Sequence, residues 1–260
     1  MLSPPNERLF GLAPREGNGL MTKPVGVTTR YVEIFAVDVS GSFKAFVALP
    51  ATLPTGVVVV IQEIFGVNNS FRDTAYQFAE MGLVAVAPDL FWRLEPEVDL
   101  TDQTEAEWQK AFDLMKRFDE GRGISDPKAT VSFAPRMTGS NGKVGTVGYC
   151  LGGQLAFLMA TRSDADINIS HYGVKLDELL GEPDQATHKL LVHIAGKDEF
   201  MPQAGRNAVI AASEGNKHVE THIYPNAQHA FARLNGVHFD RLSATIANGR
   251  TAEALARALL

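Results

Sequence analysis

Cysteine is almost absent from this sequence, whose 260 residues include one, Cys150. A single cysteine excludes an intramolecular disulfide framework and a cysteine-rich zinc site. Long apolar runs are missing as well, because the longest, Leu155 to Ala160, is far too short to span a bilayer. The N-terminus lacks a basic start followed by an apolar run. We therefore expect no signal peptide, no membrane contact and a cytoplasmic location.

Basic residues are also fewer than acidic ones. The sequence has 24 Lys and Arg residues and 30 Asp and Glu residues, which gives a net charge of −6. This balance argues against a broad nucleic-acid-binding face. The chain is 45% hydrophobic and 21% charged, which is typical of a soluble globular protein. We expect a monomer with one domain over residues 29–260, preceded at residues 1–28 by a leader or surface arm that contains several Pro and Gly residues.

The apolar spacing predicts an N-terminal hairpin followed by alternating strands and helices. Residues 31–38 and 43–49 are predicted to form antiparallel strands around a tight turn at Ser40-Gly41. Further strands are predicted at residues 57–62, 83–87, 143–148, 167–170, 190–195 and 219–224, and helices at 69–81, 104–120, 126–134, 151–161, 202–213 and 238–259. This alternation indicates the α/β class, with a mostly parallel sheet of about eight strands and helices on both faces.

The most informative motif is Gly148-Tyr149-Cys150-Leu151-Gly152, at the junction of a predicted strand and a predicted helix. Gly-x-Cys-x-Gly in this place is typical of a nucleophile elbow with cysteine in the usual serine position. The glycines let the strand and helix approach closely, and the helix N-terminus favours a thiolate. One alternative is a core cysteine beside a glycine-rich turn. A phosphate loop is the weaker alternative, because the Gly-x-Gly-x-x-Gly spacing is lacking.

An elbow nucleophile needs an acid and then a histidine later in the chain. Asp198 follows the predicted strand 190–195, and His229 follows the predicted strand 219–224. Both therefore lie past carboxyl ends of strands, where open α/β sheets place their sites. Taken alone, Asp198 could be a helix N-cap and His229 a surface histidine. Their order and positions together favour a triad of Cys150, His229 and Asp198.

The remaining histidines favour no metal site. His218 and His222 have the i, i+4 spacing of a helical zinc pair, but on a predicted strand they would lie about 13 Å apart. His193 is expected to be a hydrogen-bonded residue of a buried strand, whereas His171, just past a strand, could face the same rim as the triad. We expect neither a metal nor another cofactor.

Four segments of the chain resemble the dienelactone hydrolase (carboxymethylenebutenolidase) family, a cysteine-using branch of the α/β-hydrolases. They are residues 62–66 (Gln-Glu-Ile-Phe-Gly), residues 88–93 (Pro-Asp-Leu-Phe-Trp-Arg), the elbow at Cys150, and Asp198 with residues 229–233 (His-Ala-Phe-Ala-Arg). The separations fit too: 87 residues from Glu63 to Cys150, 48 to Asp198, and 31 more to His229. The resemblance covers about residues 29–260 and implies an α/β-hydrolase fold.

The resemblance implies roles for further residues. The family glutamate that matches Glu63 holds the resting thiol until substrate displaces it, and the family arginines that match Arg93 and Arg233 bind the substrate carboxylate. The oxyanion hole is expected to consist of the backbone N–H groups of Leu151 and Ile64. Without the resemblance, Glu63 would be a salt-bridged or solvated residue at a strand end, and each arginine a surface residue.

The implied reaction is hydrolysis of 4-carboxymethylenebut-2-en-4-olide (dienelactone) to maleylacetate in haloaromatic degradation, through a thioester acyl-enzyme. Two alternatives stay open: a carboxylesterase for another carboxylate-bearing ester or lactone, and a non-catalytic binding protein of the same fold. The enzymatic interpretations share one kind of partner, a small anionic ester or lactone. The sequence departs from the family at His171, where Tyr is frequent, and at Ala230, where a hydroxyl residue is frequent. These departures bear on the substrate more than on the chemistry.

Overall fold

Residues 26–260 are the part of the chain that the computed structural model describes. Its strands are β1 (Thr28–Phe35), β2 (Ser42–Leu49), β3 (Thr55–Ile61), β4 (Val84–Pro88), β5 (Ser140–Tyr149), β6 (Ile167–His171), β7 (Lys189–Ala195) and β8 (Val219–Tyr224). They form one eight-stranded sheet in the order β1-β2-β4-β3-β5-β6-β7-β8. Strand β2 runs antiparallel to β1 and β4, and all other neighbours are parallel. The predicted leader covers residues 1–28. Of these, residues 1–25 lie outside the described part of the chain.

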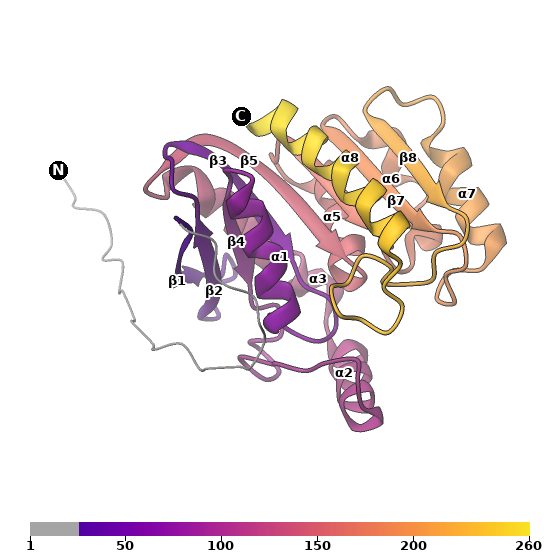
Figure 1. Ribbon diagram of the computed structural model, residues 1–260, viewed down its shortest axis with the longest axis horizontal. Helices are drawn as coiled ribbons and strands as arrows, with labels where there is room; N and C mark the ends of the chain where they lie inside the picture. Colours follow the sequence, from indigo (N-terminus) through magenta and orange to yellow (C-terminus); the bar gives the residue numbers. More distant parts are fainter. Residues whose placement is uncertain (1–25) are drawn as a thin grey trace.

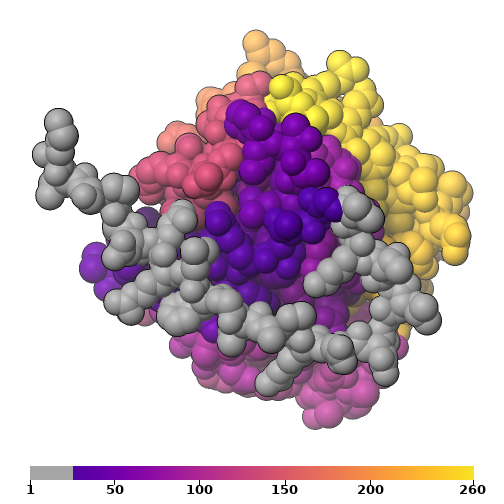
Figure 2. All heavy atoms as spheres, turned by 60° about the vertical axis from the view of Figure 1, so that its left-hand side comes forward, coloured from indigo at the N-terminus to yellow at the C-terminus, as the bar shows by residue number. Residues whose placement is uncertain are grey.

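Helices alternate with the parallel strands (Figure 1). They are α1 (Asn69–Glu80), α2 (Glu105–Arg117), α3 (Glu120–Gly123), α4 (Ser125–Phe133), α5 (Leu151–Arg162), α6 (Glu182–Gln185), α7 (Gln203–Ser213) and α8 (Arg241–Leu259), with 3₁₀ turns at Ala134–Arg136 and Leu176–Glu178. The predicted fold class, an α/β-hydrolase sheet with an N-terminal antiparallel hairpin, is confirmed. Figure 2 shows the indigo residues, which include that hairpin, on the face of the molecule turned toward the viewer.

Both faces of the sheet are covered, which explains the uninterrupted β-branched run in β3. Successive side chains of a strand point to opposite faces. Val58 and Val60 pack with α1 and α8, whereas Val57, Val59 and Ile61 pack with α4 and α5. Every residue of β3 is therefore buried. This double burial holds the carboxyl ends of the central strands in a rigid row.

Two predicted boundaries were wrong for local reasons. The hairpin turn is wider than Ser40-Gly41, because the Ala36 N–H donates to the Gly41 carbonyl and β1 ends at Phe35. The helix predicted over residues 104–120 ends at Arg117, since Phe118 has an extended backbone and Asp119 caps the separate short helix α3. Neither α3 nor α6 was predicted, since four residues are too few for a periodic apolar face.

Candidate active site

The elbow between β5 and α5 holds Cys150 in a conformation that few residues adopt. Its φ is 55° and its ψ is −114°, a combination outside the regions that L-residues prefer. The Cys150 N–H donates to the His171 carbonyl (3.1 Å), and the Cys150 carbonyl accepts from the Gln154 N–H (3.0 Å). These bonds to β6 and α5 hold the strained residue in place, at the N-terminus of α5.

The elbow glycines are required by close backbone approach. A Cβ on Gly148 would lie 1.8 Å from the Gly152 carbonyl oxygen, and a Cβ on Gly152 would lie 2.1 Å from the Ile61 carbonyl oxygen. Strand β3, strand β5 and helix α5 therefore meet without intervening side chains. This contact fixes Cys150 relative to the end of β3.

We expect Gly152→Ala to lower the free energy of unfolding by about 3 kcal/mol, because backbone must shift to make room for the methyl group. Urea titration followed by circular dichroism measures the change. The control is Gly249→Ala in α8, where the added carbon has no neighbour within 4 Å. That exposed substitution should instead stabilise by about 0.5–1 kcal/mol, since alanine favours the helix. Equal effects of the two variants would contradict the steric argument.

His229 and Asp198 form a buried pair beside the elbow. Asp198 lies in the loop after β7, and His229 in the loop after β8. The Nδ1–H of His229 donates to both Asp198 oxygens, at 2.9 and 3.1 Å. One Asp198 oxygen also accepts from the Phe200 N–H at 2.9 Å. The carboxylate thus fixes the imidazole tautomer and leaves Nε2 as the ring nitrogen available for proton transfer.

The sulfur of Cys150 is close to this imidazole. Burial opposes the charged ring, but the nearby Cys150 sulfur and the Asp198 carboxylate outweigh it and raise the pKa of His229 to about 10. No hydrogen bond of ordinary geometry joins Nε2 to the thiol, and Nε2 has no other partner among the described residues. The pair is arranged so that a proton leaving the thiol has a basic acceptor at hand.

Backbone donors converge on the same place. Ile64 follows the end of β3, and Leu151 is the first residue of α5. Neither N–H donates a hydrogen bond within residues 26–260, and both residues adjoin side chains of the site. Two unused N–H groups beside a nucleophile are suited to an oxyanion.

Glu63 and Arg233 form a buried ion pair at the pocket. The Arg233 Nε donates to Glu63 Oε2 (2.5 Å), and its Nη1 donates to Asp102 Oδ2 (2.7 Å). Burial opposes the guanidinium charge, but these carboxylates more than compensate and raise the pKa of Arg233. The other oxygen of Glu63 is buried and has no hydrogen-bond partner among residues 26–260. Glu63 therefore holds Arg233 rather than the thiol, which corrects the expectation that Cys150 donates to it.

Arg93 is not brought to the pocket. Its Nη1 binds Asp126 Oδ2 (2.5 Å), its Nη2 binds Asp38 Oδ2 (3.2 Å), and its guanidinium lies over the Trp92 ring. Asp126 is fully buried, so withdrawing Arg93 would leave an uncompensated buried carboxylate. A role for Arg93 in carboxylate binding stays a prediction that its position does not support.

The hollow beside Cys150 is open to solvent; the space within it, solvent included, is about 270 Å³, and most of the side chains around it are apolar. Trp108 and Phe112 of α2 stack on each other, and Phe200 packs edge-on against His229 with 4.7 Å between ring centres. Figure 1 shows α2 projecting from the body at this edge of the sheet. The lining residues are Ile64, Trp108, Phe112, Met115, Cys150, Val174, Phe200, His229 and Arg233. One cation in an apolar pocket suits a small anionic ligand with a flat or apolar body.

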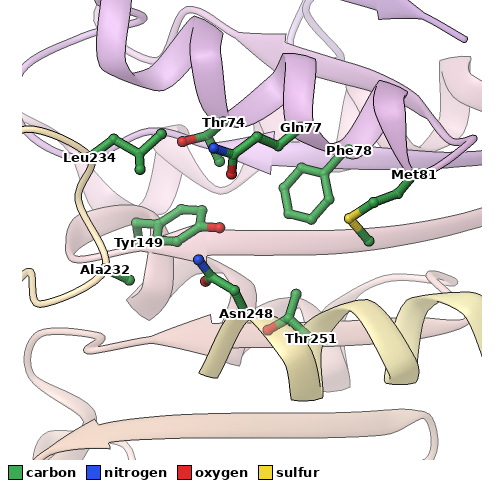
Figure 3. A pocket seen from close by; sticks show the side chains of 9 residues that line it. All are labelled: Thr74, Gln77, Phe78, Met81, Tyr149, Ala232, Leu234, Asn248 and Thr251. Carbon is green, nitrogen blue, oxygen red and sulfur yellow. The ribbon is translucent and has the colours of Figure 1, made fainter. Parts of the chain in front are cut away.

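A second hollow lies between α1 and α8, with Tyr149 among the residues that line it (Figure 3). Thr74, Gln77, Asn248 and Thr251 supply its polar groups. Neither Cys150 nor His229 lines it, and its walls carry no charged side chain. It therefore lacks the groups that the chemistry needs.

Some residues of the site had no sequence signal. Asp102, Trp108 and Phe200 stand in loops or on an exposed helix, and only their contacts reveal them. Tyr172 packs edge-on against His229 (5.3 Å) with its hydroxyl buried and unpartnered. The departure from the family pattern at the adjacent His171 was the one available hint. His171, for which a place at the rim was one alternative, is buried and bonded to Thr251 of α8.

Residues 26–260 contain neither a cluster of metal-ligating side chains nor a helix suited to a bilayer. Across residues 26–260, no three His, Cys, Asp or Glu side chains gather closely enough to hold a metal ion. None of the helices in that part of the chain combines the length and apolar character needed to cross a bilayer.

Comparison with known proteins places the chain among enzymes. The sequence model of the dienelactone hydrolase family matches residues 43–259. A protein of Azospirillum brasilense is 49% identical over 214 residues, which are 82% of this chain and 92% of that protein. The carboxymethylenebutenolidase of Pseudomonas putida is 38% identical over 215 residues, 83% of this chain and 91% of the relative. The crystal structure of a dienelactone hydrolase-like promiscuous phosphotriesterase from metagenomic libraries superimposes with a TM-score of 0.72 at 19% identity, covering 90% of this chain and all of that one.

Proposed function

Because the chain belongs to the dienelactone hydrolase family and is a hydrolase of that kind, we propose that it opens the ring of dienelactone to give maleylacetate, as in haloaromatic degradation. The observation that carries the proposal is the joint placement of Cys150, His229 and Arg233 around one apolar hollow. The hollow offers a nucleophile, a base and a cation for the carboxylate of this lactone. The name of the Pseudomonas putida relative, carboxymethylenebutenolidase, supports the substrate.

In the proposed reaction, Nε2 of His229 takes the thiol proton of Cys150 while Asp198 holds Nδ1. The sulfur attacks the lactone carbonyl carbon and forms a C–S bond, and the carbonyl oxygen becomes an oxyanion bound by the N–H groups of Ile64 and Leu151. The ring C–O bond then breaks, and His229 returns its proton to the departing oxygen. Water, deprotonated by His229, cleaves the resulting thioester and restores the thiol.

Glu63 and Arg233 would couple this chemistry to the substrate's charge. Guanidinium binds a carboxylate through paired N–H groups, and Glu63 now occupies one of those groups on Arg233. An incoming carboxylate competes with Glu63 for the same cation. Displacement of Glu63, which is buried and adjacent to the site, leaves that edge of the guanidinium to the substrate carboxylate.

The test is hydrolysis of dienelactone by the purified protein, followed as loss of ultraviolet absorbance, with neutral p-nitrophenyl esters in parallel. A much larger kcat/KM for dienelactone is the expected result. Comparable values for the lactone and the neutral esters would favour a carboxylesterase of wider range. No hydrolysis of either, and no acylation of the single thiol, would leave a binding protein of this fold.

Arg233→Ala should selectively lower the kcat/KM for anionic substrates. A lost charge-assisted pair costs about 1.5–3 kcal/mol, so kcat/KM for dienelactone should fall about tenfold to a hundredfold. Neutral esters should change much less, since they have no carboxylate to bind. Steady-state kinetics on both substrates measure the contrast. Arg93→Ala is the matched comparison: its guanidinium is held elsewhere, so its losses should be similar for both substrates.

A further inference from the structure

Arg233 lies between two carboxylates, whereas the proposed substrate binding replaces only one of them with the substrate carboxylate. Glu63 and Asp102 both bind it, and the three side chains are almost fully buried, at 7%, 4% and 8% exposed for Glu63, Asp102 and Arg233. The trio carries a net charge of −1. The negative charge of the intact trio would repel a substrate carboxylate. Either Glu63 or Asp102 must therefore leave Arg233 when the substrate binds.

The two carboxylates use different parts of the guanidinium. Glu63 accepts from Nε, and Asp102 accepts from Nη1. The Nε–H and the adjacent Nη2 form one edge of the planar group, which is the edge that a carboxylate grips side-on. No hydrogen bond to the described residues engages Nη2. Removal of Glu63 therefore exposes a complete binding edge while Nη1 stays with Asp102.

Asp102 is the more firmly fixed of the two. Its Oδ2 also accepts from the Val237 N–H (2.9 Å), and its carbonyl accepts from Trp108 Nε1 (3.0 Å). The preceding residues are tied to the end of β3, since the Leu100 N–H donates to the Phe65 carbonyl (3.0 Å). Burial alone would raise the pKa of Asp102, but the Val237 N–H and Arg233 outweigh it and lower the pKa. Glu63, in contrast, has one oxygen with no partner.

We propose that Asp102 is a positioning residue that keeps Arg233 at the pocket while Glu63 is exchanged for the substrate carboxylate. The inference rests on the proposed function, because it presumes an anionic substrate at Arg233. Asp102 neutralises the guanidinium from the side away from the exchange and prevents it from following Glu63. Without that anchor, Arg233 can pair with Glu63 through both Nε and Nη2, and the edge meant for the substrate is closed. Asp102 thereby sets the preference for anionic substrates.

The experiment compares two esters of the same chain length, mono-p-nitrophenyl succinate and p-nitrophenyl butyrate. Asp102→Asn keeps the shape and removes the charge. Its KM for the succinate ester should rise at least tenfold, with kcat for that ester and both constants for the butyrate ester within about twofold of wild type. Asp102→Glu, which restores the charge, should recover most of the preference. Asp99→Asn is the control, since Asp99 lies in the same segment but is half exposed and pairs with Arg72; it should leave both esters unchanged.

Two results would overturn the inference: an unchanged ratio of the two esters in Asp102→Asn, or equal losses on both with a lowered melting temperature, which would mark a purely structural residue. If Asp102→Asn does not fold, Asp102→Ser is measured in the same way, since its hydroxyl can accept the Val237 N–H without a charge. Failure of the proposed function is separate and appears in the wild type, as no hydrolysis of either ester. A wild type that cleaves both esters equally well is a third result that would overturn the inference, and the dienelactone assay then decides the proposed function separately.

Discussion

Cys150→Ala is expected to lose at least about 10⁴-fold in kcat/KM on dienelactone and on p-nitrophenyl esters while staying folded. The sulfur would form the covalent intermediate, and no neighbouring side chain offers a replacement nucleophile in the hollow. Its removal deletes little volume, and the backbone bonds that hold residue 150 to His171 and Gln154 remain. Steady-state rates, with circular dichroism and a melting curve as the control for folding, measure the effect.

The single cysteine makes this test unusually direct. The whole chain contains no other thiol, so any acyl-thioester found by mass spectrometry after mixing with substrate belongs to Cys150. The wild type should show the added acyl mass and Cys150→Ala should not. A folded Cys150→Ala protein with turnover near that of the wild type would remove the thioester mechanism and Cys150 as nucleophile.

The order of the candidate residues could be predicted from the sequence because parallel topology converts order along the chain into proximity. Each parallel strand ends at the same edge of the sheet, so residues just past strand ends meet there. Cys150, Asp198 and His229 follow β5, β7 and β8, and the sequence predicts a strand at each of these three places. Their proximity follows from three local patterns and one rule of topology.

Contacts between loops could not be predicted from local patterns in the sequence. Arg93 stands in a family segment, yet Asp38 and Asp126, distant from it in the sequence, hold it away from the hollow. Asp102 lies 131 residues from its partner Arg233, in a segment without apolar periodicity. Ion-pair partners are chosen by loop geometry, which depends on the completed fold. The sequence could name the charged residues but could not pair them.

His171 shows how one residue of strand length changes an assignment. The predicted strand stopped at Ser170, which would place His171 in a loop at the rim. The strand β6 includes His171, and side chains two residues apart share a face. His171 therefore points with Ile167 and Ile169 toward α8, beneath the sheet edge and away from the triad.

His171 belongs to a buried polar network that the proposed chemistry does not use. The rings of His171 and His193 lie 4.3 Å apart, and both Nε2 atoms bond Thr251 Oγ1, at 2.9 and 3.1 Å. The Nδ1 of His193 bonds the Tyr224 hydroxyl (2.8 Å), which also accepts from Arg250 (3.1 Å). The Nδ1 of His171 has no partner. This network attaches α8 to β6 and β7.

Both rings must stay neutral for the network to persist. Burial lowers the pKa of His171 to about 3. Burial, with the neighbouring His171, His222 and Arg250, lowers the pKa of His193 well below its ordinary value. If His171 were protonated on both nitrogens, its Nδ1–H would have no acceptor among the described residues. Positive charges on the rings of His171 and His193 would also repel each other at this short distance. In the unfolded chain each histidine takes up its proton near pH 6.5.

The protein is therefore expected to lose stability steeply as the pH falls below 6.5. The unfolded state binds more protons than the folded state between pH 6.5 and about 3, so the free energy of unfolding decreases with falling pH by about 1.4 kcal/mol per pH unit for each histidine. Two histidines over two units amount to about 5 kcal/mol, which rivals the whole stability of many domains. His229 adds no slope in this window, because below pH 6.5 it is protonated in the unfolded chain at its ordinary pKa and in the folded protein through its raised pKa.

Urea titrations between pH 4.5 and 7.5 measure this slope, in the wild type and in His171→Gln. The variant is less stable at pH 7.5, because it loses its fit against Thr251 and the neighbouring Tyr149 ring. With falling pH, the free energy of unfolding of the variant should nevertheless decrease by about 1.4 kcal/mol per pH unit less than that of the wild type. The reason is that the variant lacks one histidine whose protonation is suppressed in the folded state. His188→Gln, at a half-buried position whose only bond is to the adjacent Thr187, should keep the wild-type slope. A wild-type slope in His171→Gln would mean that His171 titrates normally in the folded protein, and the acid sensitivity would then have to come from the carboxylates.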